Sequence, residues 1–241
     1  ERSDRLVGSE MCIRDSTCAI LDNGDLKCWG DNWYGQVGNG AGRGNNVYSP
    51  TAVNLGTGRT AVAVSAGADH TCVLLDNDDV KCWGKDNLGQ LGYGPTTTLS
   101  GYVSGPTLAL GLNGPTWSAG VAVALAAGEG HTCAILDNGD LKCWGGGGSG
   151  QLGTGNSYTN VFSPPATAID LGTGRTAVAV SAGGYNTCAI LDNGDLKCWG
   201  ADDFGALGDG GTNTYTNTPT AIDLGTGRTA VAVSVGKFHT C

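Results

Sequence analysis

The chain has 241 residues, of which 40% are apolar and 15% charged, and its formal net charge is −9 at pH 7. This composition is globular, because it is too apolar for an acidic disordered segment. The acidic balance argues against nucleic acid or an anionic membrane surface as a partner, since both select basic patches. No apolar run approaches the roughly 18 residues that span a membrane.

The first sixteen residues differ from the rest of the chain. The letters LVGSEMCIRDS, from Leu6 to Ser16, resemble the translation of a transposon-end sequencing adapter, and they contain Met11, the only methionine. We interpret residues 1–16 as adapter-derived and exclude them from the fold. The alternative is an irregular N-terminal arm. The chain also stops at Cys241 within a repeat, so we expect residues 17–241 to be an internal fragment.

The next feature is a thirteen-residue segment that recurs. CAILDNGDLKCWG begins at Cys18, Cys133 and Cys188, and the related CVLLDNDDVKCWG begins at Cys72. With Cys241, the Thr-Cys pairs are spaced by 54, 61, 55 and 53 residues. A fixed period of this size indicates tandem structural repeats.

The recurring segment predicts a β-hairpin with two possible registers. A two-residue turn centred on Asn23 and Gly24 would set Cys18 opposite Trp29. A three-residue turn with Gly24 in a left-handed bulge would set Cys18 opposite Cys28. We prefer the second register because it places the two sulfurs side by side. Asp78 replaces the glycine in the second copy, and aspartate tolerates this conformation better than most residues.

Directly opposed cysteines lie within disulfide reach. Four pairs at one spacing predict four disulfides and an oxidising compartment. The predicted bonds are Cys18–Cys28, Cys72–Cys82, Cys133–Cys143 and Cys188–Cys198. Buried reduced thiols are the alternative, and zinc is disfavoured because each repeat offers only two sulfurs. Cys12 and Cys241 have no partner in this scheme.

Each hairpin is followed by a glycine frame, which reads GQVG, GQLG, GQLG or GALG. A variable stretch, a short segment such as SPTAVNL at 49–55, and the segment LGTGRTAVAVSAG at 55–67 come next. The alternation of Val and Ala in this last segment is typical of a strand. No segment has helical periodicity over ten residues. Four short strands in about 50 residues, repeated, predict an all-β propeller fragment of about four blades, each with four antiparallel strands.

The stretch AGADHTCVLLDNDDVKCWGKDNLGQLGYG, from Ala66 to Gly94, resembles the repeat of the regulator of chromosome condensation family. The resemblance extends over residues 17–241. It implies a seven-bladed ring, of which this chain would form an open arc with unpaired edges. The paired cysteines depart from the nuclear members and resemble a secreted or surface-exposed bacterial branch.

Several motifs suggest chemistry that their context does not support. His70, His131 and His239 recur before Thr-Cys, and a recurring histidine indicates a structural hydrogen bond. The recurring tryptophans indicate packing between blades. GTGRT lacks the lysine and the following helix of a phosphate loop. The DNGD turns supply too few oxygens for calcium. We find no nucleophile–base pair, and we expect no enzyme activity, no cofactor and no metal.

The variable stretches, at 39–49, 93–105, 154–163 and 209–218, are the candidate binding loops, because binding residues concentrate on loops of a rigid scaffold. Their aromatic residues are the candidate binding residues, with neutral drift of the loops as the alternative: Tyr48, Tyr93, Tyr102, Tyr158, Phe162 and Tyr215.

We therefore expect a non-catalytic interaction module of a secreted or cell-surface protein. It would recognise a protein or a glycan through loops on one propeller face, with no nucleic acid partner and no membrane insertion. The family resemblance also allows a guanine-nucleotide exchange regulator of a small GTPase, against which the cysteine pairs count. An inhibitor of a secreted enzyme is a further alternative.

Overall fold

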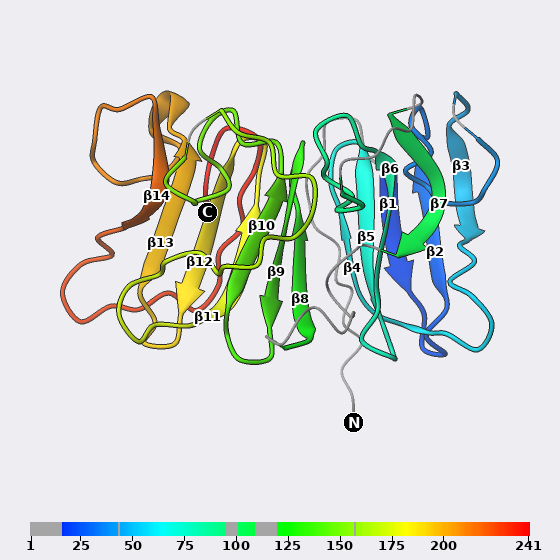
Figure 1. Cartoon of the computed structure of the whole chain (residues 1–241), viewed down its shortest axis with the longest axis horizontal. Helices are drawn as coiled ribbons and strands as arrows, with labels where there is room; N and C mark the ends of the chain where they lie inside the picture. The colour runs from blue at the N-terminus through cyan, green and yellow to red at the C-terminus, as the bar shows by residue number, and fades with distance from the viewer. Residues whose placement is uncertain (1–15, 43, 95–100, 109–119, 157) are drawn as a thin grey trace.

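The computed structural model describes residues 16–42, 44–94, 101–108, 120–156 and 158–241. It is all-β, as predicted, with four antiparallel sheets side by side (Figure 1). Residues 1–15 of the stretch 1–16 lie outside the described residues, so its interpretation as an adapter stays a prediction. Ser16, however, is the first residue of β1 and belongs to the fold.

The sheets follow the four repeats in order. The first contains β1 (Ser16–Ile20), β2 (Leu26–Gly30) and β3 (Val47–Ala52). The second contains β4 (Ala61–Ala66), β5 (His70–Leu75), β6 (Val80–Lys85) and β7 (Tyr102–Leu108). The third contains β8 (Ala122–Ala127), β9 (His131–Leu136) and β10 (Leu141–Gly145). The fourth contains β11 (Ala177–Ala182), β12 (Asn186–Leu191), β13 (Leu196–Ala201) and β14 (Tyr215–Ala221), with a 3-10 turn at Asp203–Gly205.

The hairpins adopt the bulged register. Cys18 pairs with Cys28 and Ile20 pairs with Leu26, and Gly24 has a left-handed φ of 82°. Asp78 takes the same conformation, with a φ of 67°. The preferred register is therefore confirmed. Disulfides join the opposed cysteines in all four hairpins: Cys18–Cys28, Cys72–Cys82, Cys133–Cys143 and Cys188–Cys198.

The first and third sheets each have three strands where four were expected. In the third sheet, the missing outer strand would contain Pro164 and Pro165, which have no N–H for a strand ladder. Only an isolated bridge between Gly145 and Val161 forms there. The buried Lys142 ammonium instead donates to the carbonyl oxygens of Pro165 (3.2 Å) and Ala166 (2.9 Å). Burial lowers the pKa of Lys142.

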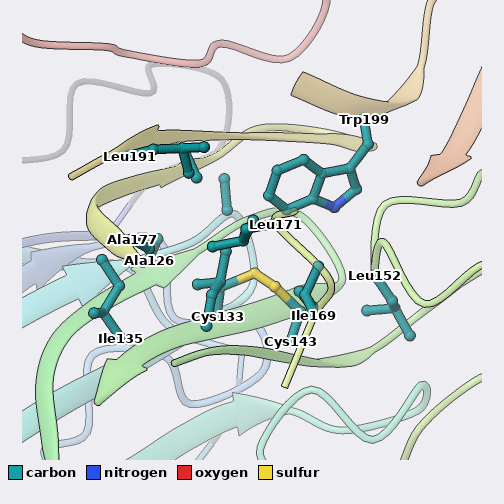
Figure 2. Packing of buried hydrophobic residues seen from close by; sticks show 13 residues of the cluster. Ala126, Cys133, Ile135, Cys143, Leu152, Ile169, Leu171, Ala177, Leu191 and Trp199 are labelled. Carbon is teal, nitrogen blue, oxygen red and sulfur yellow. A yellow bond between two sulfur atoms is a disulfide. The ribbon is translucent and has the colours of Figure 1, made fainter. Parts of the chain in front are cut away.

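The core lies between adjacent sheets. Around the Cys133–Cys143 disulfide, Ile135 of the third sheet packs with Leu191 and Trp199 of the fourth (Figure 2). Trp83, Trp144 and Trp199 are completely buried. Their predicted role in packing between blades is confirmed for these three. Trp29 is half-buried.

The first strands of successive sheets, β4, β8 and β11, contact one another, and β7 and β14 are the last strands of their sheets. β4, β8 and β11 are therefore the inner strands, which lie nearest to the axis around which the sheets are arranged. The turns that follow them, at 67–69, 128–130 and 183–185, and the turn at the equivalent position 236–238 are called the inner turns below.

Candidate functional site

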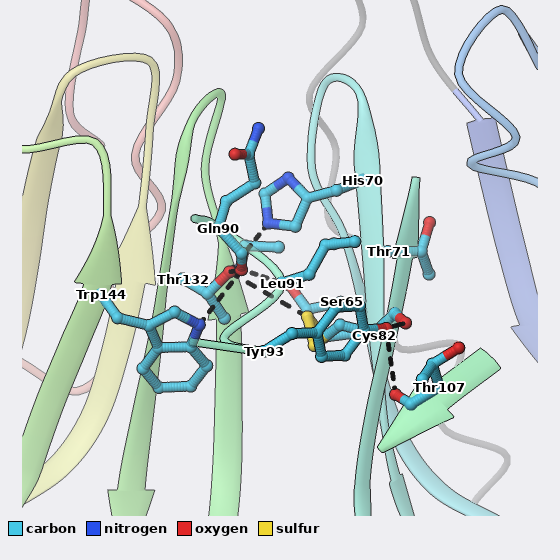
Figure 3. Close-up of a disulfide and its surroundings, with 12 residues drawn as sticks. Ser65, His70, Thr71, Cys82, Gln90, Leu91, Tyr93, Thr107, Thr132 and Trp144 are labelled. Carbon is cyan, nitrogen blue, oxygen red and sulfur yellow. Dashed lines mark hydrogen bonds between the residues drawn. A yellow bond between two sulfur atoms is a disulfide. The ribbon is translucent and has the colours of Figure 1, made fainter. Parts of the chain in front are cut away.

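The recurring threonine and tryptophan meet at one carbonyl oxygen, and the recurring histidine bonds to the threonine. The Thr132 hydroxyl and the Trp144 indole N–H both donate to the Gln90 carbonyl oxygen of the preceding repeat, at 2.8 and 3.1 Å (Figure 3). Because the Thr132 hydroxyl donates its proton to Gln90, its oxygen acts as the acceptor for His70 Nε2, 2.8 Å away. The His70 proton consequently lies on Nε2. This network joins successive repeats.

The geometry makes His70 and His131 structural, as predicted, whereas His239 is exposed. His70 and His131 are fully buried, and their Nδ1 atoms have no hydrogen-bond partner among the described residues. Desolvation lowers the pKa of His70 to about 3 and that of His131 to about 4. Both are neutral at physiological pH, with Nε2 already occupied. Asn186 stands at the same position in the fourth repeat.

The variable stretches emerge at one end of the sheets. Strand pairing sets Lys85 opposite Tyr102 and His70 opposite Gly84. The starts of the outer strands therefore lie at the same end as the inner turns. The same holds in the fourth sheet, where Ala201 pairs with Tyr215.

The predicted aromatic residues differ in exposure. Tyr48 is 92% exposed and Tyr158 is 75% exposed, while Phe162 and Tyr215 are exposed to a lesser degree. The structure brings two of them together, since the rings of Tyr158 and Tyr215 meet edge to face with centroids 6.2 Å apart. Tyr102 is half-buried in β7.

Tyr93 has a structural environment. Its hydroxyl donates to the carbonyl oxygen of Cys82 and lies 3.2 Å from that of Thr107 (Figure 3). The ring packs against the core of the second and third repeats. Desolvation raises the pKa of Tyr93 above its usual range. Tyr93 thus differs from the other predicted binding residues in contributing to the packing of its own repeat.

A second group of side chains on the same end was not predicted. We call it the inner-turn surface, and it consists of Tyr34, Asp69, Lys85, Glu129, Tyr185, Phe204, Lys237 and Phe238. One signal in the sequence could have revealed it. Between the glycine and the His or Asn of each inner turn, the two residues read AD, EG, GY and KF, while their flanks repeat.

Contacts between repeats link the inner-turn surface. Lys85 Nζ lies 2.8 Å from Asp69 Oδ2 and 4.7 Å from the centre of the Tyr34 ring. Glu129 accepts from the Tyr185 hydroxyl at 3.3 Å and pairs with Lys237 at 3.1 Å.

The part of the inner-turn surface that lies beside the fourth sheet is aromatic. Phe204 and Phe238 meet edge to face at 6.4 Å, and Phe204 is 92% exposed. Main-chain hydrogen bonds join the inner turns below this surface, including Ala68 to Gly128 and Glu129 to Gly183.

The described residues contain no group of three or more His, Cys, Asp or Glu side chains placed to hold a metal ion. No helix in this part of the chain has the length and apolar character to cross a membrane.

Four sheets of short strands define a β-propeller repeat protein. One repeated hydrogen-bond network joins the sheets, and a disulfide cross-links each hairpin. The chain belongs to the regulator of chromosome condensation (RCC1) repeat family. One family profile matches residues 23–74, 138–190 and 193–241, and a second matches residues 61–90, 122–151 and 177–206.

Among curated proteins, the chain is 30% identical over 228 residues to the ultraviolet-B receptor UVR8 of Arabidopsis thaliana, covering 93% of this chain and 48% of that protein. It is 31% identical over 236 residues to the mitochondrial RCC1 domain-containing protein RUG3 of the same plant, covering 92% and 50%. The chain spans about half the length of these relatives.

Solved structures share the fold. Human WBSCR16 superposes with a TM-score of 0.77 at 22% identity, covering 95% of this chain and 55% of that one. Yeast RCC1 (Prp20), in complex with Kap60, gives 0.78 at 21% identity, covering 94% and 51%. The ectodomain of the Physcomitrella patens receptor kinase CR4 gives 0.54 at 22% identity, covering 94% and 46%.

Proposed function

We propose that this chain is a non-catalytic binding module of a secreted or cell-surface protein, which recognises a protein or a glycan through the inner-turn surface and the loops beside it. One observation carries the proposal. The repeated His, Thr and Trp side chains are buried and join the repeats, whereas the residues that differ between the inner turns and between the variable stretches include exposed aromatic side chains at one end of the sheets. A rigid scaffold with variable residues on one face is the usual form of a binding protein.

The composition of the inner-turn surface suits a macromolecule. Aromatic side chains such as Tyr185 and Phe204 are the residue types that dominate binding energy in interfaces. The charges of Lys85 and Lys237 are paired with carboxylates rather than free. Such a surface does not favour a polyanion, so nucleic acid is not the proposed ligand.

The four disulfides support a location in an oxidising compartment. The CR4 ectodomain supports it further, since it is the outer part of a receptor and has the same fold. These cysteine pairs also favour the secreted or surface-exposed branch of the family that the sequence resembles. The seven-bladed closure of the whole protein remains part of this proposal.

The experiment compares three forms of the chain on arrays of secreted proteins and glycans. The face variant carries Tyr34→Ala, Tyr185→Ala and Phe204→Ala. The tip variant carries Asn138→Ala and Asp140→Ala in a hairpin turn at the opposite end. We expect a ligand of the parent chain to bind the tip variant equally and the face variant at least about tenfold more weakly. Equal binding to all three forms would contradict the proposal.

Two of the alternatives have their own readouts. Accelerated release of labelled GDP from a panel of small GTPases would favour an exchange regulator. Inhibition of secreted hydrolases, lost in the face variant, would favour an enzyme inhibitor. The inhibitor is the second candidate, because the same exposed aromatic surface fits a protein partner in an oxidising compartment.

A further inference from the structure

A groove separates the third and fourth repeats on the outer wall of the sheets. Its volume is about 470 Å³, which lies in the usual range for small-molecule sites. It is bounded by residues 153–155, by residues 167–172, and by Thr218 and Pro219 of the outermost strand β14. The yellow-green chain between β10 and β11 runs beside the fourth sheet here (Figure 1). The groove is therefore separate from the inner-turn surface.

A groove of about 400 Å³ lies at the equivalent junction of the first and second repeats. Both grooves begin at the glycine frame, and a short side chain follows this frame in each, Asn39 in the first repeat and Thr154 in the third. The second repeat has Tyr93 at this position, and its ring packs into the core. A tyrosine at this position therefore occupies space that Asn39 and Thr154 leave open.

The groove between the third and fourth repeats contains an ammonium group that has no hydrogen-bond partner among the described residues. Lys81 and Lys142, at the same strand position in earlier repeats, donate to main-chain carbonyl oxygens. Lys197 lines the groove, is half-buried, and makes no hydrogen bond to any residue that the structure describes. A partly desolvated ammonium group without a partner favours a ligand that accepts hydrogen bonds.

The other polar residues that line the groove complement the Lys197 ammonium group, which is a hydrogen-bond donor. Asp170 binds the main-chain N–H of Gly172 through one carboxylate oxygen, at 2.8 Å. Thr154 and Thr218 also line the groove, with Ile169 and Pro219 as apolar residues. Carboxylate, ammonium and hydroxyl groups lining one groove match the hydroxyls of a ligand, each of which donates and accepts. The Asp170 carboxylate offsets the Lys197 charge and disfavours an anion.

We propose that this groove is a binding site for a neutral saccharide unit, with Lys197 as donor, Asp170 as acceptor, and Ile169 and Pro219 against the carbon face of the sugar ring. The exposed edge-to-face pair of Tyr158 and Tyr215 joins the same two repeats and offers further ring surface. A lining that combines apolar surface with a few polar groups suits a sugar, which has hydroxyl groups and a carbon face.

The test uses saturation-transfer NMR and calorimetry with neutral trisaccharides of glucose, mannose and N-acetylglucosamine, and with a trimer of galacturonic acid. We expect at least one neutral trisaccharide to bind with a dissociation constant of about 1 mM or tighter. Lys197→Met and Thr154→Tyr should each weaken binding by about tenfold or more, because one removes the donor and the other fills the groove.

Asn39→Tyr is the matched control, since it fills the equivalent groove between the first and second repeats. It and the face variant should bind the sugar as the parent chain does, and thermal melting should show that all variants are folded. The site assignment is overturned if no neutral trisaccharide binds, if only the acidic trimer binds, or if Asn39→Tyr abolishes binding while Lys197→Met does not. The proposed macromolecular function would survive each of these results.

Discussion

The hydroxyl of Thr132 donates to the main-chain carbonyl oxygen of Gln90, 2.8 Å away in the preceding repeat. Thr71 and Thr187 make the same bond to Gln36 and Gln151. The bonded residues lie 35 to 42 positions apart in the sequence. Each bond therefore helps to fix how one sheet sits on the next.

Replacing Thr132 with valine should lower the free energy of unfolding by about 2 kcal/mol, because a side chain of similar shape leaves buried polar partners unsatisfied. Thr17→Val is the control, since Thr17 has the same place in its hairpin but is exposed. Urea unfolding measures both. An equal loss in the two variants would show that the threonine network adds nothing.

Acid should destabilise the fold through His70 and His131. Their pKa values are lowered to about 3 and about 4 from an ordinary 6.5, so the unfolded chain binds protons that the folded chain does not. Stability is complete above pH 6.5 and falls as the pH drops towards these folded values. By linkage the loss at pH 5 is about 4 kcal/mol for the two residues together. Urea unfolding at several pH values between 7.5 and 5 measures this loss of unfolding free energy.

The control for acid sensitivity is His70→Asn combined with His131→Asn, which copies the natural Asn186. The double variant should be less stable at neutral pH but should lose most of this dependence on pH. An unchanged slope would mean that other groups cause it.

Removing one disulfide should destabilise the chain without unfolding it. Cys133→Ala with Cys143→Ala opens a loop of eleven residues, and the chain-entropy estimate for such a loop is about 3 kcal/mol. Packing loss adds to this value, since both side chains are fully buried. Non-reducing peptide mapping should find the other three pairs intact. Scrambled pairing in the parent chain would contradict the hairpin register.

Ala206→Gln should stabilise the fourth repeat. In the other frames the glutamine Oε1 accepts from the main-chain N–H two residues earlier, as Gln90 does from Leu88 at 3.0 Å. Ala206 lacks this acceptor, and Phe204, two residues before it, has a left-handed φ of 64°. A non-glycine residue there costs about 1 kcal/mol or more. We expect a gain of about 1 kcal/mol and a change in the Phe204 N–H to Hα coupling constant. No change in this coupling would refute the explanation.

The tyrosines of the variable stretches should respond differently to substitution. Tyr48→Ala should change the unfolding free energy by less than about 0.5 kcal/mol, because the side chain is almost fully exposed. Tyr93→Phe should cost about 1 kcal/mol, because it removes the donor to Cys82 and Thr107. Melting curves distinguish them. Equal effects would show that the two tyrosines do not differ in role.

The sequence by itself determined the local structure. The spacing of Cys18 and Cys28 with a glycine at the bulge predicted the register and the disulfides, because both follow from the geometry of one short hairpin. The repeat period predicted the propeller, the resemblance of residues 66–94 to a known repeat indicated the family, and the recurrence of His70 and His131 predicted their structural role. Each inference used neighbouring residues or a simple period.

The tertiary structure decided what depends on contacts between repeats. Tyr93 and Tyr158 both lie in variable loops, but the Tyr93 side chain packs against the core and the Tyr158 side chain is exposed. No local sequence pattern distinguishes the two tyrosines. The absence of a fourth strand in the third sheet follows from Pro164 and Pro165 and leaves carbonyl oxygens to Lys142. The inner-turn surface and the groove at Lys197 combine residues from different repeats. Their relative positions arise only when the sheets stack, because the hydrogen bonds and side-chain volumes that place them act across more than thirty residues of chain.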